Sequence, residues 1–167
     1  MKNYQEWYDH IAGNIENRPF LLSLLRTFNR FMTTVMPIVY LTLLATTCLQ
    51  EGLGKKIWIY LFVPASGFVI LSLLRKKINA PRPYEEWAIK PLLDRDRPGQ
   101  SMPSCHVFSA TIISMACLHA SLSVGVILLV FSALLGLVRV LGGVHFPKDV
   151  VVGYMCGLVW GVLFFLF

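Results

Sequence analysis

Residues 107–141 read VFSATIISMACLHASLSVGVILLVFSALLGLVRVL, an almost unbroken apolar run. One transmembrane helix needs about 20 apolar residues, so this run is too long for a single crossing of a bilayer. Near its middle, the sequence His119-Ala-Ser-Leu-Ser is polar enough for a turn. The run therefore predicts a hairpin of two membrane-spanning helices, and it places the chain among the helical membrane proteins.

The composition of the whole chain agrees with a membrane protein. The chain has 167 residues, about one domain, with a hydrophobic fraction of 56% and a mean hydropathy of +0.63. A soluble domain of this size needs more polar residues to cover its surface. None of the four cysteines belongs to a CxxC pair, which argues against a zinc knot or a redox pair and leaves the compartment open.

Three further stretches are long and apolar enough to cross the membrane, namely residues 31–49, 57–74 and 150–167. Together with the hairpin they predict five transmembrane helices in a single all-α domain that covers residues 1–167. In the last stretch, small residues recur every four positions and allow close approach of helix backbones. We expect these glycines to pack on other spans of the same chain rather than in a dimer, and the sequence leaves the oligomeric state open; they are Gly153, Gly157 and Gly161.

Residues 1–30 differ from the rest because they mix aromatic and charged side chains. They lack a continuous apolar core, so we expect no cleavable signal peptide. Tyr8, Ile11 and Ile15 have helical spacing, and aromatic side chains suit the headgroup layer of a membrane. We expect an interfacial amphipathic helix that leads into the first span, with a partly ordered tail as the alternative.

Positive charge is concentrated in the connection between the second and third spans. The net charge is +6, and seven of the fifteen Lys and Arg residues lie within residues 75–97. Such a cluster indicates anionic lipid headgroups, a phosphate substrate or topology signals. We expect no nucleic-acid partner, because the basic residues interrupt membrane segments and no nucleic-acid-binding module is visible. Residues 75–104 also contain five prolines, and we expect a short surface helix over residues 84–93.

Three clusters of polar residues lie at the ends of predicted spans. The first, residues 75–83, follows the second span, and the second, residues 103–106, precedes the third span. The third cluster, Arg139 with His145 and Asp149, lies between the fourth and fifth spans. Counting the crossings puts all three clusters on the same side of the membrane, so we expect them to form one site.

The side chains of these clusters match the chemistry of a phosphoryl group. Arg75, Arg82 and Arg139 are permanent cations whose donor forks fit phosphate oxygens. Ser104 offers a hydroxyl, and residues 104–106 begin a helix whose first N–H groups have no partners within the helix. These groups together predict an oxyanion pocket.

Two histidines and a carboxylate complete the candidate site. His145 and Asp149 are four residues apart, which brings their side chains together on a helix or turn. An Asp that accepts from one imidazole nitrogen leaves the other nitrogen free as a nucleophile. His106 is then placed to protonate the leaving oxygen. This set predicts a hydrolase that works without a metal ion.

Each of these features has a simpler interpretation. Arg and Lys at the end of a span are more often topology anchors than ligands. Asp149 is a suitable residue to cap the last helix. His119 lies alone at the hairpin turn, and we assign it no chemistry. The chemical interpretation depends on all the clusters sharing one face of the membrane.

The clusters resemble the type 2 phosphatidic acid phosphatase superfamily, which also includes vanadium haloperoxidases. That family has three sequence blocks, KxxxxxxRP, PSGH and SRxxxxxHxxxD. Residues 75–149 carry all three in the same order and with the same internal spacing. They read Arg75-KKINAP-Arg82-Pro83, Pro103-Ser104-Cys105-His106 and Val138-Arg139-VLGGV-His145-FPK-Asp149.

The resemblance implies a role for each matching residue. His145 corresponds to the nucleophile that forms a phosphohistidine, Asp149 to its orienting partner, and His106 to the general acid. Members of this kind need no metal ion, so the resemblance implies neither a metal nor another cofactor. The residues implied to bind the substrate phosphate are Arg75, Arg82, Ser104, Cys105 and Arg139.

Three positions depart from the family pattern. Arg75 stands in place of Lys, which keeps the charge but replaces a point charge by a planar fork. Val138 stands in place of Ser, which removes one possible hydrogen bond. Cys105 stands in place of Gly, so its side chain must point away if its backbone N–H holds phosphate.

The function that we expect is hydrolysis of a lipid phosphate whose tail stays in the bilayer. A prenyl diphosphate is the first candidate, followed by phosphatidylglycerol phosphate and phosphatidic acid. The alternatives are a lipid phosphotransferase with the same intermediate and a lipid-binding protein that keeps a degenerate pocket. A haloperoxidase is disfavoured because the membrane spans point to a lipid substrate.

The sidedness of this multi-pass protein has conflicting signals. Five spans put thirteen of the fifteen Lys and Arg residues on the side of the polar clusters, with only Lys55 and Lys56 opposite. Positive charge favours the cytoplasmic side. The resemblance implies the outer face of the cell membrane, and this is the orientation that we expect.

Overall fold

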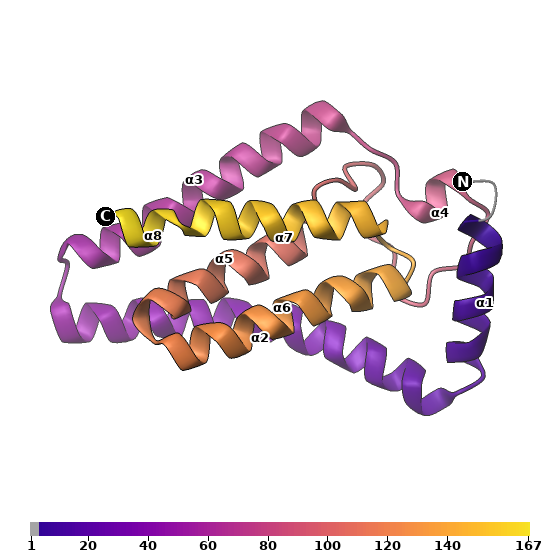
Figure 1. Cartoon of the computed structure of the whole chain (residues 1–167), viewed down its shortest axis with the longest axis horizontal. Helices are drawn as coiled ribbons and strands as arrows, with labels where there is room; N and C mark the ends of the chain where they lie inside the picture. Colours follow the sequence, from indigo (N-terminus) through magenta and orange to yellow (C-terminus); the bar gives the residue numbers. More distant parts are fainter. Residues whose placement is uncertain (1–3) are drawn as a thin grey trace.

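The computed structural model describes residues 4–167, which form a helical bundle with one long loop (Figure 1). The predicted all-α membrane bundle is confirmed, because the described residues contain several helices with the length and composition to cross a membrane. These helices are α2 (Pro19–Glu51), α3 (Lys55–Ile78), α6 (Leu122–Leu141) and α7 (Pro147–Gly161), the last continued by α8 (Leu163–Leu166).

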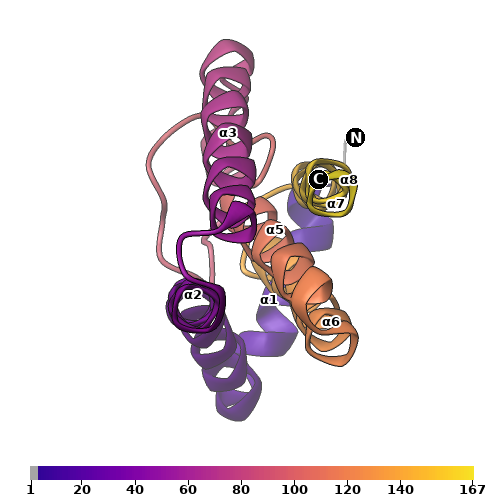
Figure 2. The same ribbon diagram turned by 90° about the vertical axis from the view of Figure 1, so that its left-hand side faces the viewer.

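The remaining apolar helix, α5 (Cys105–Ala120), lies within the bundle and packs on α2, α3, α6 and α7 (Figure 2). At 1.5 Å per residue its 16 residues extend for about 24 Å, less than the roughly 30 Å of a hydrocarbon core. Residues 110–117 are all buried, so neighbouring helices rather than lipid cover this helix. The predicted hairpin is confirmed, since the chain turns at Ser121 between α5 and α6.

The glycines of α7 face α5. A Cβ atom added at Gly153 would lie 2.6 Å from the carbonyl oxygen of Ser104. A Cβ atom at Gly157 would lie 2.6 Å from the Cβ of Thr111, and Gly161 lies against Met115 in the same way. Larger residues would therefore push α7 away from α5. The glycines pack within the chain, as expected, and they hold the start of α5 against α7.

The predicted boundary of the first span is wrong. We expected one interfacial helix over residues 1–30, but α1 (Tyr4–Glu16) ends early and α2 begins at Pro19. Proline suits the first position of a helix, and no glycine or proline separates Pro19 from the predicted span at residues 31–49. Residues 19–30 are therefore part of the spanning helix.

The predicted surface helix over residues 84–93 is also wrong in extent, because only one turn forms, α4 (Pro83–Glu86). Pro91 disfavours helical backbone at the residue before it. The N–H of Leu92 donates to the carbonyl oxygen of Gly142 at 3.0 Å. This part of the loop is therefore bound to the turn after α6 and has no hydrogen bonds left for a helix.

Helix α1 crosses the end of the bundle (Figure 1). Its buried face consists of Tyr4, Tyr8 and Ala12, four residues apart, and it packs on Ile89 and Leu92 of the long loop. The predicted N-terminal helix is confirmed, but the face that we expected to meet lipid headgroups contacts protein instead.

Candidate active site

The three predicted polar clusters lie at one end of the bundle, where α3 and α6 end and α5 and α7 begin (Figure 1). Arg82, Arg139, His106 and His145 come together there from four separate segments. Arg75 lies slightly apart from them. The packing of α5, α6 and α7 on one another brings Arg139, His106 and His145 together, and the loop between α3 and α5 adds Arg82.

The ring of His145 is held by Ser101 and Asp149. The Ser101 Oγ lies 2.6 Å from the Asp149 Oδ2 and 3.2 Å from the His145 Nδ1. Since a carboxylate only accepts hydrogen bonds, the Ser101 hydroxyl donates to Asp149 and accepts from the Nδ1–H of His145. The lone pair of the ring is therefore on Nε2, which faces the Arg82 Nη1 at 3.5 Å.

Asp149 acts on His145 less directly than the sequence predicted. Its Oδ2 lies 3.7 Å from the His145 Nδ1, beyond hydrogen-bond distance, and Ser101 bridges the two. The same Oδ2 accepts the N–H of Phe146 at 3.0 Å, at the start of α7. The orienting role and the capping role that we considered as alternatives are thus compatible.

His145 is a neutral base in a dry environment. Its side chain is 1% exposed. Burial lowers its pKa to about 4, the Asp149 carboxylate opposes this shift, and the guanidinium groups of Arg139 and Arg82 add to it. The ring is therefore uncharged near pH 7, as a nucleophile must be.

Helix α1 supports the turn that carries His145. Gly143 in this turn has φ = 73° and lies against the ring of Tyr8, where a Cβ atom would be 2.6 Å from Cζ. A side chain at this position would meet both backbone strain and a clash. The ring of Phe146 packs on Tyr4 with 5.0 Å between centroids. The packing of α1 therefore fixes Gly143 and Phe146, which flank His145 in the sequence.

Two of the predicted arginines converge on Asp96. The Arg82 Nη1 donates to the Asp96 Oδ2 at 2.8 Å, and the Arg139 Nη2 donates to the same oxygen. The two arginine side chains are 4% and 3% exposed. Burial raises the pKa of the Asp96 carboxyl, but Arg139 and Arg82 outweigh burial and hold this pKa below its ordinary value. Asp96 is therefore an ionised carboxylate at neutral pH.

The backbone around Asp96 is tied to α4. The Tyr84 hydroxyl donates to the Asp96 carbonyl oxygen at 3.0 Å. The Gly99 N–H donates to the Glu85 Oε2 at 2.9 Å, and the Arg82 Nε donates to the Arg97 carbonyl oxygen at 3.0 Å. These bonds keep the Asp96 segment beside the arginines.

The start of α5 contributes Ser104, Cys105 and His106. The Ser104 N–H donates to the Asp149 carbonyl oxygen at 2.9 Å, whereas its Oγ is buried and has no hydrogen-bond partner in residues 4–167. Cys105 is partly buried and packs against the apolar core around α5. The ring of His106 lies near His145 and Asp96, with one ligand atom from each of the three within 4.8 Å of the others.

Arg75 is the predicted phosphate ligand that the structure leaves outside this cluster. Its Nη2 and Nε donate to the Gln100 carbonyl oxygen at 2.6 and 3.1 Å. With Arg82 and Arg97 it lines a separate polar pocket of about 310 Å³. Arg75 therefore adds positive charge on the side of Arg82 that lines this second pocket.

A larger polar pocket opens on the other side, with a volume of about 620 Å³. His106, Arg139 and Asp96 line its inner part, and Arg26 and Asn29 of α2 line its outer part. The Asn29 Oδ1 accepts from the Arg139 Nη1 at 3.3 Å. This pocket therefore carries both cationic and acidic groups.

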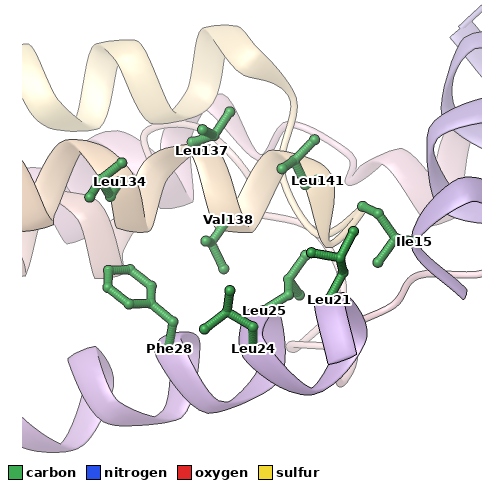
Figure 3. A pocket seen from close by; sticks show the side chains of 9 residues that line it. All are labelled: Ile15, Leu21, Leu24, Leu25, Phe28, Leu134, Leu137, Val138 and Leu141. Atoms are coloured by element: carbon green, nitrogen blue, oxygen red, sulfur yellow. The ribbon is translucent and has the colours of Figure 1, made fainter. Parts of the chain in front are cut away.

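An apolar groove of about 400 Å³ lies next to this pocket, between α2 and α6 (Figure 3). Figure 3 shows the side chains of Leu25 and Phe28 from α2 facing Val138 from α6. The groove and the polar pocket share these helices, because Phe28 precedes Asn29 and Val138 precedes Arg139. The groove and the polar pocket have no lining residue in common, but neighbouring residues of α2 and α6 line each of them.

Three side chains of the polar cluster are also of the types that bind metal ions. Asp96, His106 and His145 offer three ligand atoms within 4.8 Å of one another. However, the Asp96 oxygen already accepts from two guanidinium groups, and a divalent cation would be repelled by both. The donor set therefore fits an anion better than a metal ion.

Sequence reasoning missed Ser101 and Asp96. Ser101 stands just before Pro103 and Ser104, and a serine at such a position has no feature that sets it apart from other loop serines. Asp96 lies between Arg95 and Arg97, in a segment that we described only as basic. A carboxylate among arginines near a predicted phosphate site was the available signal.

Comparisons with known proteins agree with these features. Residues 56–167 match the family model of the PAP2 superfamily. The undecaprenyl-diphosphatase BcrC of Bacillus subtilis (strain 168) is 30% identical over 147 residues, which are 87% of this chain and 76% of that protein. The crystal structure of LpxE from Aquifex aeolicus has a TM-score of 0.76 at 24% identity, and the match covers 97% of this chain and 94% of that chain.

A second solved structure has the same fold. It is a transmembrane PAP2-type phosphatidylglycerolphosphate phosphatase from Bacillus subtilis, with a TM-score of 0.71 at 23% identity. The match covers 99% of this chain and 85% of that chain. The region matched by the family model contains residues 75–149, with all three polar clusters.

Proposed function

The chain belongs to the PAP2 superfamily and is a membrane lipid phosphatase of that type, and we propose that it hydrolyses a prenyl diphosphate through a phosphohistidine. The observation that carries the mechanism is the neutral His145, whose free Nε2 faces a buried guanidinium group. A nucleophile and two cations in one dry site match the needs of phosphoryl transfer.

The proposed reaction has two steps. The His145 Nε2 attacks the terminal phosphorus, a P–N bond forms, and the bond between phosphorus and the bridging oxygen breaks. Burial and the Arg139 guanidinium lower the pKa of His106 to about 4, so its ring first takes up a proton, which the negative charge of the bound phosphate favours. His106 then gives this proton to the leaving oxygen. His106 then takes a proton from water, the water oxygen attacks phosphorus, and the P–N bond breaks to release phosphate.

Binding in this mechanism depends on Arg82, Arg139 and Ser104. The two guanidinium groups hold the equatorial oxygens of the transferring group, where negative charge must be stabilised. The unpartnered Ser104 Oγ supplies a further donor. Ser101 and Asp149 keep the Nδ1 of His145 protonated, so that Nε2 remains the attacking atom.

The groove and the larger polar pocket support a lipid diphosphate as substrate. The groove of Figure 3 suits an acyl or prenyl tail, since its lining is apolar. The pocket between the groove and His106 carries Arg26 and Arg30, which suit a second phosphate in the leaving group. The relative BcrC is named an undecaprenyl-diphosphatase, which also favours a prenyl diphosphate over the other lipid phosphates.

The orientation in the membrane is part of the proposal. We place the active site on the outer face, although thirteen of the fifteen Lys and Arg residues share its side. Labelling of an Asp94→Cys variant by an impermeant thiol reagent in intact cells tests this. Labelling without permeabilisation supports the outer face, and labelling only after permeabilisation contradicts it.

The activity is tested with purified protein in detergent and a panel of lipid phosphates. We expect phosphate release without an added acceptor, the fastest rate with a prenyl diphosphate, and inhibition by orthovanadate. A chelator should leave the rate unchanged. A folded preparation that releases no phosphate from any of these lipids would contradict the proposal, and release only with an acceptor lipid would indicate a phosphotransferase.

A further inference from the structure

We propose that the Asp96 carboxylate is a selectivity gate, which occupies the phosphate-binding arginines and gives way only to a phosphate group with more than one negative charge. Phosphodiester headgroups, which surround the protein in any bilayer, would then be kept out of the active site. This inference rests on the proposed phosphatase function and names the substrate class that the site admits.

The first argument is that Asp96 and a phosphoryl group need the same donors. The Asp96 Oδ2 accepts from the Arg82 Nη1 at 2.8 Å and from the Arg139 Nη2. A phosphoryl group bound to His145 needs hydrogen bonds from the same two guanidinium groups. The carboxylate and the phosphoryl group therefore cannot both be bound by Arg82 and Arg139 through these nitrogens.

The second argument is that Asp96 shields the nucleophile. The His145 side chain is 1% exposed, and His145 is not among the described residues that line either polar pocket. Asp96 is 25% exposed and lines the larger pocket, and its oxygen lies within 4.8 Å of the His145 ring nitrogen. From this pocket, the Nε2 of His145 is reached past the Asp96 carboxylate.

The third argument is the balance of charge. A carboxylate has one negative charge, and so has a phosphodiester, so exchange of one for the other gains no Coulomb energy from the two arginines. A phosphomonoester carries about 1.5 to 2 negative charges at pH 7, and its attraction to the same two cations is correspondingly larger. A terminal phosphate of a diphosphate has the same advantage. Asp96 therefore sets a threshold of charge for entry.

The loop allows this exchange without unfolding. The backbone of Asp96 is held by the Tyr84 hydroxyl, which donates to the Asp96 carbonyl oxygen at 3.0 Å. Its side chain borders a pocket of about 620 Å³, into which the carboxylate can turn. Rotation of one side chain is therefore enough to release both arginines.

The gate is tested by inhibition constants of inorganic phosphate and of dimethyl phosphate, a phosphodiester, with the purified full-length protein in detergent. Asp96→Asn should lower the inhibition constant of phosphate about ten-fold, as expected for one charged competitor removed, and should make dimethyl phosphate inhibitory. Asp96→Glu, which keeps the charge, should bind phosphate as weakly as the unchanged protein. Asp9→Asn is the matched control, because Asp9 on α1 is exposed, has no ion pair in residues 4–167 and lines neither polar pocket, and it should change neither constant. An unchanged or higher inhibition constant for phosphate in Asp96→Asn would overturn the proposal.

A measurement on the unchanged protein covers the case in which Asp96→Asn does not fold. Carbodiimide labelling of carboxylates, read by mass spectrometry, should rise at Asp96 when orthovanadate is added and stay constant at Asp9, which is exposed and lines neither polar pocket. If orthovanadate does not change the labelling of Asp96, the proposal that Asp96 is a selectivity gate is wrong. If no lipid phosphate is hydrolysed, the proposed function fails, but calorimetric titration with inorganic phosphate still compares the affinities of the two proteins.

Discussion

Each end of the helix bundle holds a histidine in a hydrogen bond, and the two histidines have different surroundings. The His119 Nδ1, at the end of α5, lies 2.9 Å from the Tyr60 hydroxyl, and the two rings meet edge to face. At the other end, His145 lies against Ser101, and its free nitrogen faces Arg82.

The difference between the two ends lies in charge and burial rather than in residue type. His119 has one uncharged partner, and it closes the turn of a hairpin. His145 has a neutral hydroxyl on one side and guanidinium groups on the other, in a position that is 1% exposed. The surroundings of the ring nitrogens, rather than the position of a histidine at the end of a span, therefore separate the proposed nucleophile His145 from the structural His119.

The largest effect is expected from removal of the two histidines in turn. His145→Ala should lower kcat/KM by about a thousand-fold or more, because no other group can form the phosphohistidine. His119→Ala should keep kcat/KM within about two-fold and lower the free energy of unfolding by about 1 kcal/mol through loss of one hydrogen bond. Phosphate release and thermal unfolding in detergent measure both effects. His145→Ala protein that is folded and retains more than a few per cent of activity would contradict the assignment.

A smaller effect is expected from the buried serines. Ser101→Ala should lower kcat about 10- to 100-fold and change KM much less, because the Nδ1–H of His145 loses its acceptor and the ring loses its fixed tautomer. Ser114→Ala is the control, since the Ser114 Oγ is equally buried and lies 3.0 Å from the Ser132 Oγ, far along α5. Steady-state kinetics with one lipid phosphate compare them. Equal losses in the two variants would reduce Ser101 to a packing residue.

These two comparisons also show how much of the site can be derived from the sequence. The lengths of the apolar runs determine the number of crossings, and the number of crossings puts the three polar clusters on one side of the membrane. Most of the predicted site residues come together for this reason. Arg75 does not join them, because its side chain donates to the Gln100 carbonyl oxygen.

The remaining features depend on tertiary contacts that have no periodic pattern. Ser101 is one loop residue among many until α7 brings Asp149 to it. Asp96 lies in a segment that has no regular secondary structure, and only the convergence of Arg82 and Arg139 gives it a role. The buried face of α1 packs on the apolar residues Ile89 and Leu92 of the long loop rather than on lipid. This contact could not be predicted, because the loop is mostly polar and its two apolar residues have no periodic spacing.

A further prediction concerns the pH dependence of kcat/KM, which should reflect the lowered pKa of His145. Because burial lowers the pKa of His145 to about 4, its ring stays neutral from pH 7 down to about pH 5, and the acid limb of kcat/KM that reports His145 should lie below the ordinary histidine range. The rate should be measured with a substrate whose own phosphate titration is known. An acid limb near pH 6.5 in the unchanged protein, after correction for the titration of the substrate, would contradict this.

The same shift predicts a change in stability. Between about pH 6.5 and pH 4, the histidine in the unfolded chain binds a proton that the folded His145 does not bind. The free energy of unfolding should therefore fall as the pH falls through this range, by at most about 1.4 kcal/mol per pH unit from this residue. Thermal unfolding of His145→Asn, whose side chain does not titrate, should show a flatter pH dependence. Identical slopes for the two proteins would show that His145 is not held neutral.

The smallest effect is expected at Cys105, the position where the family pattern has glycine. The Cys105 side chain packs against the core around α5, and we expect the backbone N–H groups at the start of this helix, rather than the thiol, to meet a phosphate oxygen. Cys105→Gly should therefore change kcat/KM by no more than about two-fold, while stability falls by up to about 1 kcal/mol because glycine is less favourable in a helix. Cys117→Gly, deeper in α5, is the matched control and should destabilise the protein more, since Cys117 is buried. A severe loss of activity in Cys105→Gly, with little loss of stability, would show that the thiol takes part in binding or catalysis and that backbone groups alone do not account for this part of the pocket.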